Sequence, residues 1–216
     1  MELIAQMLHL FQQGGPIMYI MALCSLLTVM IAFERIFYFR KITQNDADLQ
    51  LRIRQSLERG MLSETIQLCE KNQPNVVAEI TAAGVKAMQQ GASVENALEG
   101  AAAFSAANLR KRLDTLSMLV TLSPILGLLG TVIGMIQSFS VLNLQNGQPM
   151  AITGGVGEAL IATATGLTVA TAALVLHNIF SHKVNNMITN MEQMMVLVLH
   201  HASLKKLKWR DVHEIA

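Results

Sequence analysis

The chain has 216 residues and carries 16 Lys and Arg against 15 Asp and Glu, a formal net charge of +1. Charged residues make up 14% of the sequence and hydrophobic residues 52%, whereas soluble domains carry about 25% charged residues. This composition excludes a disordered chain, and two cysteines are too few for a disulfide scaffold. The balanced charge argues against a nucleic-acid binder. The composition still allows two classes, a soluble helical protein and a membrane protein.

The N-terminal part contains a long uncharged run. No charge lies between Glu2 and Glu34, and about 20 apolar residues suffice to cross a bilayer as a helix. We expect a transmembrane helix over 17–39, preceded by an extracytoplasmic amphipathic segment over 1–16. Because basic residues follow the span rather than precede it, we expect an anchor and not a cleaved signal peptide.

Residues 40–112 hold ten of the 16 Lys and Arg and are predicted to form a helical domain. The positive-inside rule places this domain and the C-terminus in the cytoplasm and the N-terminus on the outer side of the membrane. Ser93 is an N-cap candidate. Because no stop signal follows it, one helix is predicted from Ser93 to about Leu142, with a kink at Pro124.

Between Asp114 and Lys183 the only charged residue is Glu158. The turn signals in NLQNGQP at 143–149 divide this stretch into two spans, over 113–142 and 152–180, joined by a periplasmic loop over 143–151. Residues 181–216 are predicted to form a cytoplasmic helix and tail. The expected fold is an all-α membrane protein with three transmembrane helices, two of them long and extending into the cytoplasmic helical domain.

Known enzyme motifs are missing from the sequence. There is no P-loop, GxGxxG, CxxC or HExxH, and the six His are scattered. The pair His200–His201 does not converge on one point, since neighbours on a helix face different directions. We therefore predict no enzymatic activity, no metal site and no cofactor.

Glu158 is the first candidate functional residue. A carboxylate costs about 2.5–3.5 kcal/mol in the bilayer centre, so such residues usually face a bundle interior or a water path. The alternative is an interfacial Glu stabilised by the dipole at the start of its own helix.

A second candidate is a row of small and hydroxyl-bearing residues in the second span. Gly127, Thr131, Gly134 and Ser138 recur at helical spacing and share one face. Such a face allows close helix packing, or it lines a narrow wet path in which hydroxyls relay protons. Periodicity alone favours packing.

Two segments, PILGLLGTVIGMIQSF at 124–139 and GVGEALIATATGLTVATAALVLHNIF at 155–180, resemble the MotA/TolQ/ExbB proton-channel family. Three spans and a large insert after the first resemble its ExbB/TolQ branch. The resemblance implies a bacterial inner-membrane proton-channel subunit of an ExbB–ExbD–TonB-like motor, which couples the proton motive force to outer-membrane transport. It also implies a homopentamer around an ExbD- or TolR-like single-span partner with a protonatable Asp, acting on a TonB- or TolA-like protein.

The resemblance assigns Thr131 and Thr163 as pore threonines and Glu158 as the family's glutamate. On an ideal helix Thr163 lies about 140° from Glu158, so either the helix is not ideal or the two residues act at different interfaces. Thr165 shares the face of Glu158 and is a further proton-pathway candidate. The alternatives are a TolQ-like subunit of a Tol-Pal-type envelope system and a non-conducting membrane assembly scaffold.

Overall fold

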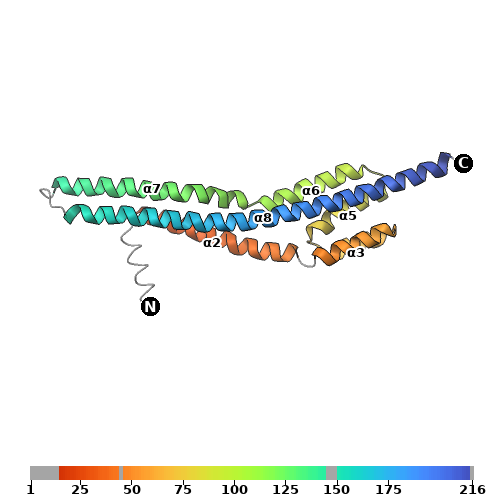
Figure 1. Ribbon diagram of the computed structural model, residues 1–216, viewed down its shortest axis with the longest axis horizontal. Helices are drawn as coiled ribbons and strands as arrows, with labels where there is room; N and C mark the ends of the chain where they lie inside the picture. The colour runs from red at the N-terminus through yellow and green to blue at the C-terminus, as the bar shows by residue number, and fades with distance from the viewer. Residues whose placement is uncertain (1–14, 44–45, 145–149, 215–216) are drawn as a thin grey trace. The chain divides into compact units, whose positions relative to one another are not determined.

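A computed structural model describes residues 15–43, 46–144 and 150–214 of the protein, and every regular element in these ranges is a helix. The helices, in chain order, are α2 (Ile17–Ile42), α3 (Asp46–Glu58), α4 (Leu62–Lys71), α5 (Val76–Gln90), α6 (Val94–Arg110), α7 (Leu113–Leu144) and α8 (Met150–Glu214) (Figure 1). The predicted all-α fold is confirmed. The predictions for the segment 1–16 and the loop 143–151 fall mostly outside the described residues.

Within the described ranges, three helices are long and apolar enough to cross a membrane. The predicted spans 17–39, 113–142 and 152–180 lie within α2, α7 and α8. The positions of the membrane boundaries on these helices stay predictions. The chain divides into two compact units, a membrane unit of residues up to 34 with 112–180, and a helical unit of 35–111 with 181–216.

The membrane unit is apolar outside as well as inside. Along α2 the buried residues Ile17, Met21, Cys24, Thr28 and Ile31 recur every three or four positions. Large apolar side chains cover the outward faces of the three helices. They include Leu23, Leu26, Phe33, Ile125, Leu128, Ile136, Leu160 and Leu167. Such a surface suits lipid or other transmembrane helices, because water offers it no favourable contact.

The helical unit has an ordinary hydrophobic core. Its largest fully buried side chains come from the end of α2, which contributes Phe39, and from α3, α5, α6 and the C-terminal part of α8. Among them are Ile53, Leu57, Ile80, Val85, Leu98, Leu109 and Met191. In α4, burial and the neighbouring Glu70 raise the pKa of Cys69 to about 12, so this thiol stays protonated and unreactive at neutral pH.

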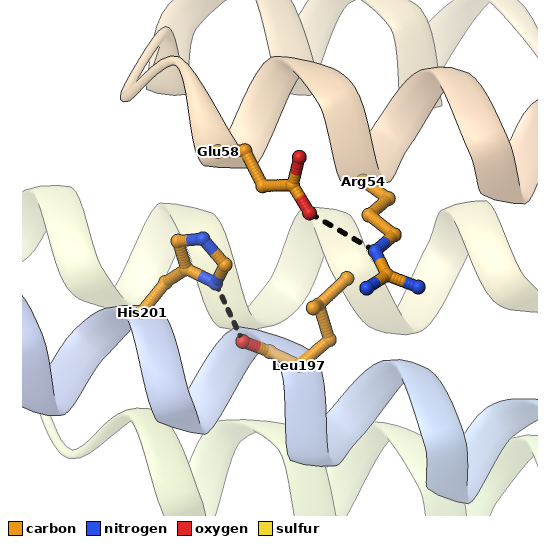
Figure 2. Close-up of polar contacts among 4 residues, drawn as sticks. All are labelled: Arg54, Glu58, Leu197 and His201. Atoms are coloured by element: carbon orange, nitrogen blue, oxygen red, sulfur yellow. Dashed lines mark hydrogen bonds and ion pairs between the residues drawn. The ribbon is translucent and has the colours of Figure 1, made fainter.

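Figure 2 shows one polar contact on α3 and one on α8, each of them within its own helix. On α3, Arg54 Nε lies 3.0 Å from Glu58 Oε1 four residues later. On α8, His201 Nδ1 lies 2.9 Å from the carbonyl oxygen of Leu197 and carries the proton of this hydrogen bond. Among the described residues no group of three or more His, Cys, Asp or Glu is arranged to hold a metal ion.

The prediction of one continuous helix from Ser93 to Leu142 is wrong. Ser93 does cap a helix, but α6 ends at Arg110, and Arg112 adopts a left-handed φ of 76° before α7 begins at Leu113. Within the helical unit, the buried Arg35 donates a hydrogen bond from Nη2 to the Lys111 carbonyl. A cation at a helix C-terminus is favourable, so this contact stabilises the end of α6 without a local Gly or Pro.

Two other helix predictions concern the apolar spans. Pro124 lies inside α7, which continues on both sides of it, and the kink there stays a prediction. The helix of the third span does extend far beyond residue 180, since α8 is a single element of 65 residues.

The start of α5 provides a test of this packing. Asn75 is 3% exposed, and its side chain accepts hydrogen bonds from the backbone N–H groups of Val77 and Ala78, at 2.9 and 3.2 Å. Asn75→Ala leaves both donors buried without an acceptor, and we expect a loss of about 1–2 kcal/mol of unfolding free energy. Thermal unfolding of the purified protein in detergent, followed by circular dichroism, measures this loss.

The matched control is Ser93→Ala at the start of α6. Ser93 is exposed and accepts a single N–H, from Asn96 at 3.4 Å. Its removal is expected to lower the unfolding free energy by only about 0.5 kcal/mol. Equal losses for the two variants would contradict the structural importance of the Asn75 cap.

Candidate functional site

Small residues bring α7 and α8 into close contact in the membrane unit. A Cβ placed on Gly127 would lie 3.2 Å from both the Ala162 carbonyl oxygen and the Thr163 Cα. One placed on Gly134 would lie 2.9 Å from the Gly155 carbonyl oxygen. Because later positions on α7 meet earlier positions on α8, the two helices run antiparallel. Such an approach is typical of small-residue interfaces between membrane helices.

The α8 side of this interface is a matching stripe that the sequence interpretation missed. Gly155, Ala159, Ala162 and Gly166 have the same spacing as the row predicted on α7. Ala159 and Ala162 are 4% and 1% exposed. A Cβ on Gly166 would lie 2.8 Å from the Ser123 carbonyl oxygen of α7. The repeated spacing of small residues was the signal that would have identified this stripe.

On α7 the contact is made by Gly130 rather than by its neighbour Thr131. Gly130 is buried, and a Cβ there would lie 2.5 Å from the Cβ of Ala162. Thr131 is half-buried, and its hydroxyl donates to the Leu128 carbonyl in its own helix, at 2.6 Å. Ser138 is 2% exposed and donates to the Gly134 carbonyl at 2.9 Å. Gly127, Gly134 and Ser138 therefore lie in the helix contact, while Thr131 lies at its margin.

Thr163 connects the two conspicuous sequence segments. Its Oγ1 donates to the carbonyl oxygen of Gly127 on α7, at 3.3 Å. The first Gly of GLLGTV and the Thr of EALIAT are thus direct partners. Thr165, in contrast, is half-buried and donates to the Ile161 carbonyl of its own helix, at 2.8 Å.

Glu158 lies against the start of α2. A Cβ on Gly15, which has a φ of 69°, would overlap the Glu158 carboxylate. The side chain is half-buried. Glu158 follows Met150, the first residue of α8, by eight positions, which is about 12 Å of helix. The dipole of a helix falls off beyond its first turn, so it acts only weakly at this depth, and both interpretations of Glu158 stay predictions.

Glu158 and Thr163 thus contact different helices. The carboxylate meets the beginning of α2 and the hydroxyl meets α7, although α8 is one helix through both positions. This arrangement accounts for their separation of about 140° around an ideal helix. The alternative of a distorted helix at this point is not needed.

Ser123 is a further polar residue in this unit that the sequence interpretation did not single out. It is fully buried, and its hydroxyl has no hydrogen-bond partner among the described residues. Its own carbonyl oxygen lies next to Gly166 of α8. A buried hydroxyl without a partner is costly, and its place beside Pro124 gave no signal of this in the sequence.

Chemically, the stretch between Asp114 and Lys183 offers one carboxylate, that of Glu158, and several hydroxyls along α7 and α8. A carboxylate accepts and releases protons, and hydroxyls both donate and accept hydrogen bonds. The hydroxyls of Thr131, Thr163 and Thr165 each donate to a backbone carbonyl.

Comparison with known proteins agrees with this arrangement. The model of the MotA/TolQ/ExbB proton channel family matches residues 72–193. An ExbB homolog from Methanothermobacter thermautotrophicus is 31% identical over 187 residues, which cover 86% of this chain and 66% of that protein. The chain thus spans just under two thirds of that relative.

Two further relatives carry ExbB and TolQ names. The biopolymer transport protein ExbB-like 3 of Synechocystis is 32% identical over 171 residues, which cover 72% of this chain and 76% of that protein. The Tol-Pal system protein TolQ of Haemophilus influenzae is 37% identical over 79 residues, which cover 36% of this chain and 35% of that protein. Because the family model spans more than half of the sequence and includes the α7–α8 contact, the chain belongs to the MotA/TolQ/ExbB proton channel family, in its ExbB/TolQ branch.

Proposed function

We propose that the chain is an inner-membrane proton-channel subunit of an ExbB–ExbD–TonB-like motor, which couples the proton motive force to outer-membrane transport. Glu158 carries this proposal. It is the only charged residue between Asp114 and Lys183, and it is half-buried where α8 meets the start of α2. A carboxylate kept in an apolar span is usually functional.

A second chain is part of the proposal. One carboxylate cannot relay protons across a bilayer about 30 Å thick, so another protonatable group must complete the path. An ExbD- or TolR-like single-span partner with an Asp supplies this group, and a homopentamer of this chain encloses the partner's helix. The apolar outward faces of α2, α7 and α8 support both kinds of helix contact.

In this proposal the N-terminus is periplasmic and residues 40–112 and 181–216 are cytoplasmic. The clustering of Lys and Arg in these two regions supports this orientation. The helical unit then forms a cytoplasmic collar that holds the subunits together. A TolQ-like role in a Tol-Pal-type system is the second candidate, supported by the similarity to the Haemophilus influenzae protein TolQ.

Proton flux distinguishes a motor subunit from a non-conducting assembly scaffold. The full chain is reconstituted into liposomes with and without the single-span protein that co-purifies with it. We expect flux driven by a membrane potential only when both proteins are present. A complex that assembles fully but conducts no protons would support the scaffold, and the identity of the co-purifying partner separates the ExbB-like from the TolQ-like role.

Thr163 gives a sharper test of the path. Thr163→Val keeps the side-chain shape but removes the hydrogen bond to Gly127, and membrane helix hydrogen bonds are worth about 0.6 kcal/mol. We expect this small loss of unfolding free energy together with a severalfold loss of partner-dependent flux. Thr163→Ser, which keeps the hydroxyl, should retain both. Unchanged flux in the Val variant would restrict Thr163 to helix packing.

A further inference from the structure

A small pocket with both apolar and polar residues in its lining lies in the helical unit, next to the end of α2. Its volume is about 250 Å³. The residues that matter for its chemistry are Tyr38, Lys41, Pro74, Glu79, Ser105 and Asn108. We propose that this pocket binds the headgroup of a zwitterionic phospholipid with a primary amine, phosphatidylethanolamine.

The position of the pocket favours a lipid. A helix that begins at Ile17 crosses a hydrocarbon core of about 30 Å in about 20 residues. Tyr38 and Lys41 come in the next turn, at the depth of the headgroups, where Tyr and Lys are favoured. Phe37, one turn before Lys41 on the same face of α2, is 67% exposed and offers an apolar surface to an acyl chain.

The charges in the pocket favour a zwitterion. Lys41 supplies a cation and Glu79 an anion, and among the described residues the two form no ion pair with each other. The pocket therefore keeps opposite charges apart. An anionic headgroup would meet the Glu79 carboxylate, and a purely cationic ligand would meet the Lys41 ammonium. A phosphate at Lys41 and an ammonium at Glu79 satisfy both.

The remaining polar groups favour a primary amine over choline. Ser105 is 4% exposed and donates to Glu79 Oε2 at 3.4 Å, which holds the carboxylate at the pocket wall. Glu79 and the Asn108 side-chain carbonyl accept hydrogen bonds, and ethanolamine has three N–H donors where choline has none. Choline sites use several aromatic rings, whereas this pocket has only Tyr38.

The Tyr38 ring, which lines one side of the pocket, is held in position by a neighbouring side chain. The guanidinium carbon of Arg35 lies 5.0 Å from the centre of the Tyr38 ring, within the range of a cation–π contact. Arg35 is itself 3% exposed. The Tyr38 ring is therefore held by Arg35, while Lys41, three residues later, is exposed. The volume accommodates a headgroup but not a whole lipid, so the acyl chains must lie outside, along α2.

Native mass spectrometry of the full chain in detergent tests this site. The protein is titrated with phosphatidylethanolamine, phosphatidylglycerol and phosphatidylcholine of identical acyl chains, and with soluble glycerophosphoethanolamine. We expect the ethanolamine lipid to bind best. Glu79→Gln should weaken its binding about tenfold, since a hydrogen bond to a charged group is lost, without weakening phosphatidylglycerol. Lys41→Gln should weaken both lipids.

The controls are Glu95→Gln and Lys71→Gln, which change exposed charges outside the pocket and should bind lipid as the wild type does. Equal binding of the three lipids, or unchanged binding in Glu79→Gln, would overturn the proposal. Binding of glycerophosphoethanolamine as tight as that of the lipid would overturn its assignment to a membrane lipid. None of these results depends on proton conduction, so the site and the proposed function fail or stand separately.

Discussion

Gly166→Ala is expected to push α7 and α8 apart and to lower the unfolding free energy of the membrane unit by about 1–3 kcal/mol. The added Cβ would lie 2.8 Å from the Ser123 carbonyl oxygen and 3.0 Å from the Gly127 Cα. Both are backbone atoms, which cannot rotate away as a side chain can. The separation should also weaken the neighbouring hydrogen bond from Thr163 to Gly127.

A second glycine of α8 isolates this effect. A Cβ on Gly157 would meet no atom within 4 Å, and Ala is favoured over Gly in a helix by about 1 kcal/mol. Gly157→Ala should therefore be neutral or stabilising. Both variants are purified in detergent and compared by thermal unfolding. A Gly166→Ala protein as stable as Gly157→Ala would show that the close α7–α8 contact is not required.

Much of this architecture was predictable because charged side chains are costly within a lipid bilayer. The uncharged run from 3 to 33 and the nearly uncharged stretch from 115 to 182 fixed the number of spans, since each charge in a bilayer is costly. The turn signals at 143–149 divided the second stretch. These arguments depend only on local composition, and α2, α7 and α8 agree with them.

Features that depend on contacts between distant residues were not predictable. The break between α6 and α7 contains neither Gly nor Pro, and the hydrogen bond from Arg35 to Lys111 joins residues 76 positions apart. Tertiary contacts of this kind override local helix signals. Periodicity likewise placed Thr131 in the row on α7, whereas the neighbouring Gly130 makes the close contact with Ala162.

The surroundings of Glu158 combine both cases. Its isolation in an apolar stretch was evident from the sequence, and so was its separation from Thr163 around the helix. Which helix it meets was not, because Gly15 lies far from it in the chain. The contact between the Glu158 carboxylate and Gly15, at the start of α2, is therefore known only from the structure.

Glu158→Gln is expected to reduce partner-dependent proton flux by about a hundredfold or more, the usual contribution of a side chain that transfers protons. Glutamine retains the size of the side chain and one acceptor oxygen, so it preserves the packing contact with Gly15. It cannot bind and release a proton near neutral pH. Glu158→Ala should abolish flux equally, whereas Glu158→Asp should retain part of it. Flux is measured in liposomes that contain equal amounts of the assembled complex.

The control is Glu192→Gln, which removes an exposed carboxylate from α8 within the helical unit. It should conduct as the wild type does. If Glu158→Ala lost flux while Glu158→Gln kept it, Glu158 would act as a structural contact at the start of α2. Flux lost in both, with assembly and thermal stability unchanged in the Gln variant, would support a role of the Glu158 carboxylate itself in the proton path. The acidic residue of the partner would then be the second protonatable group of the pathway, because a single carboxylate cannot carry protons across the whole bilayer.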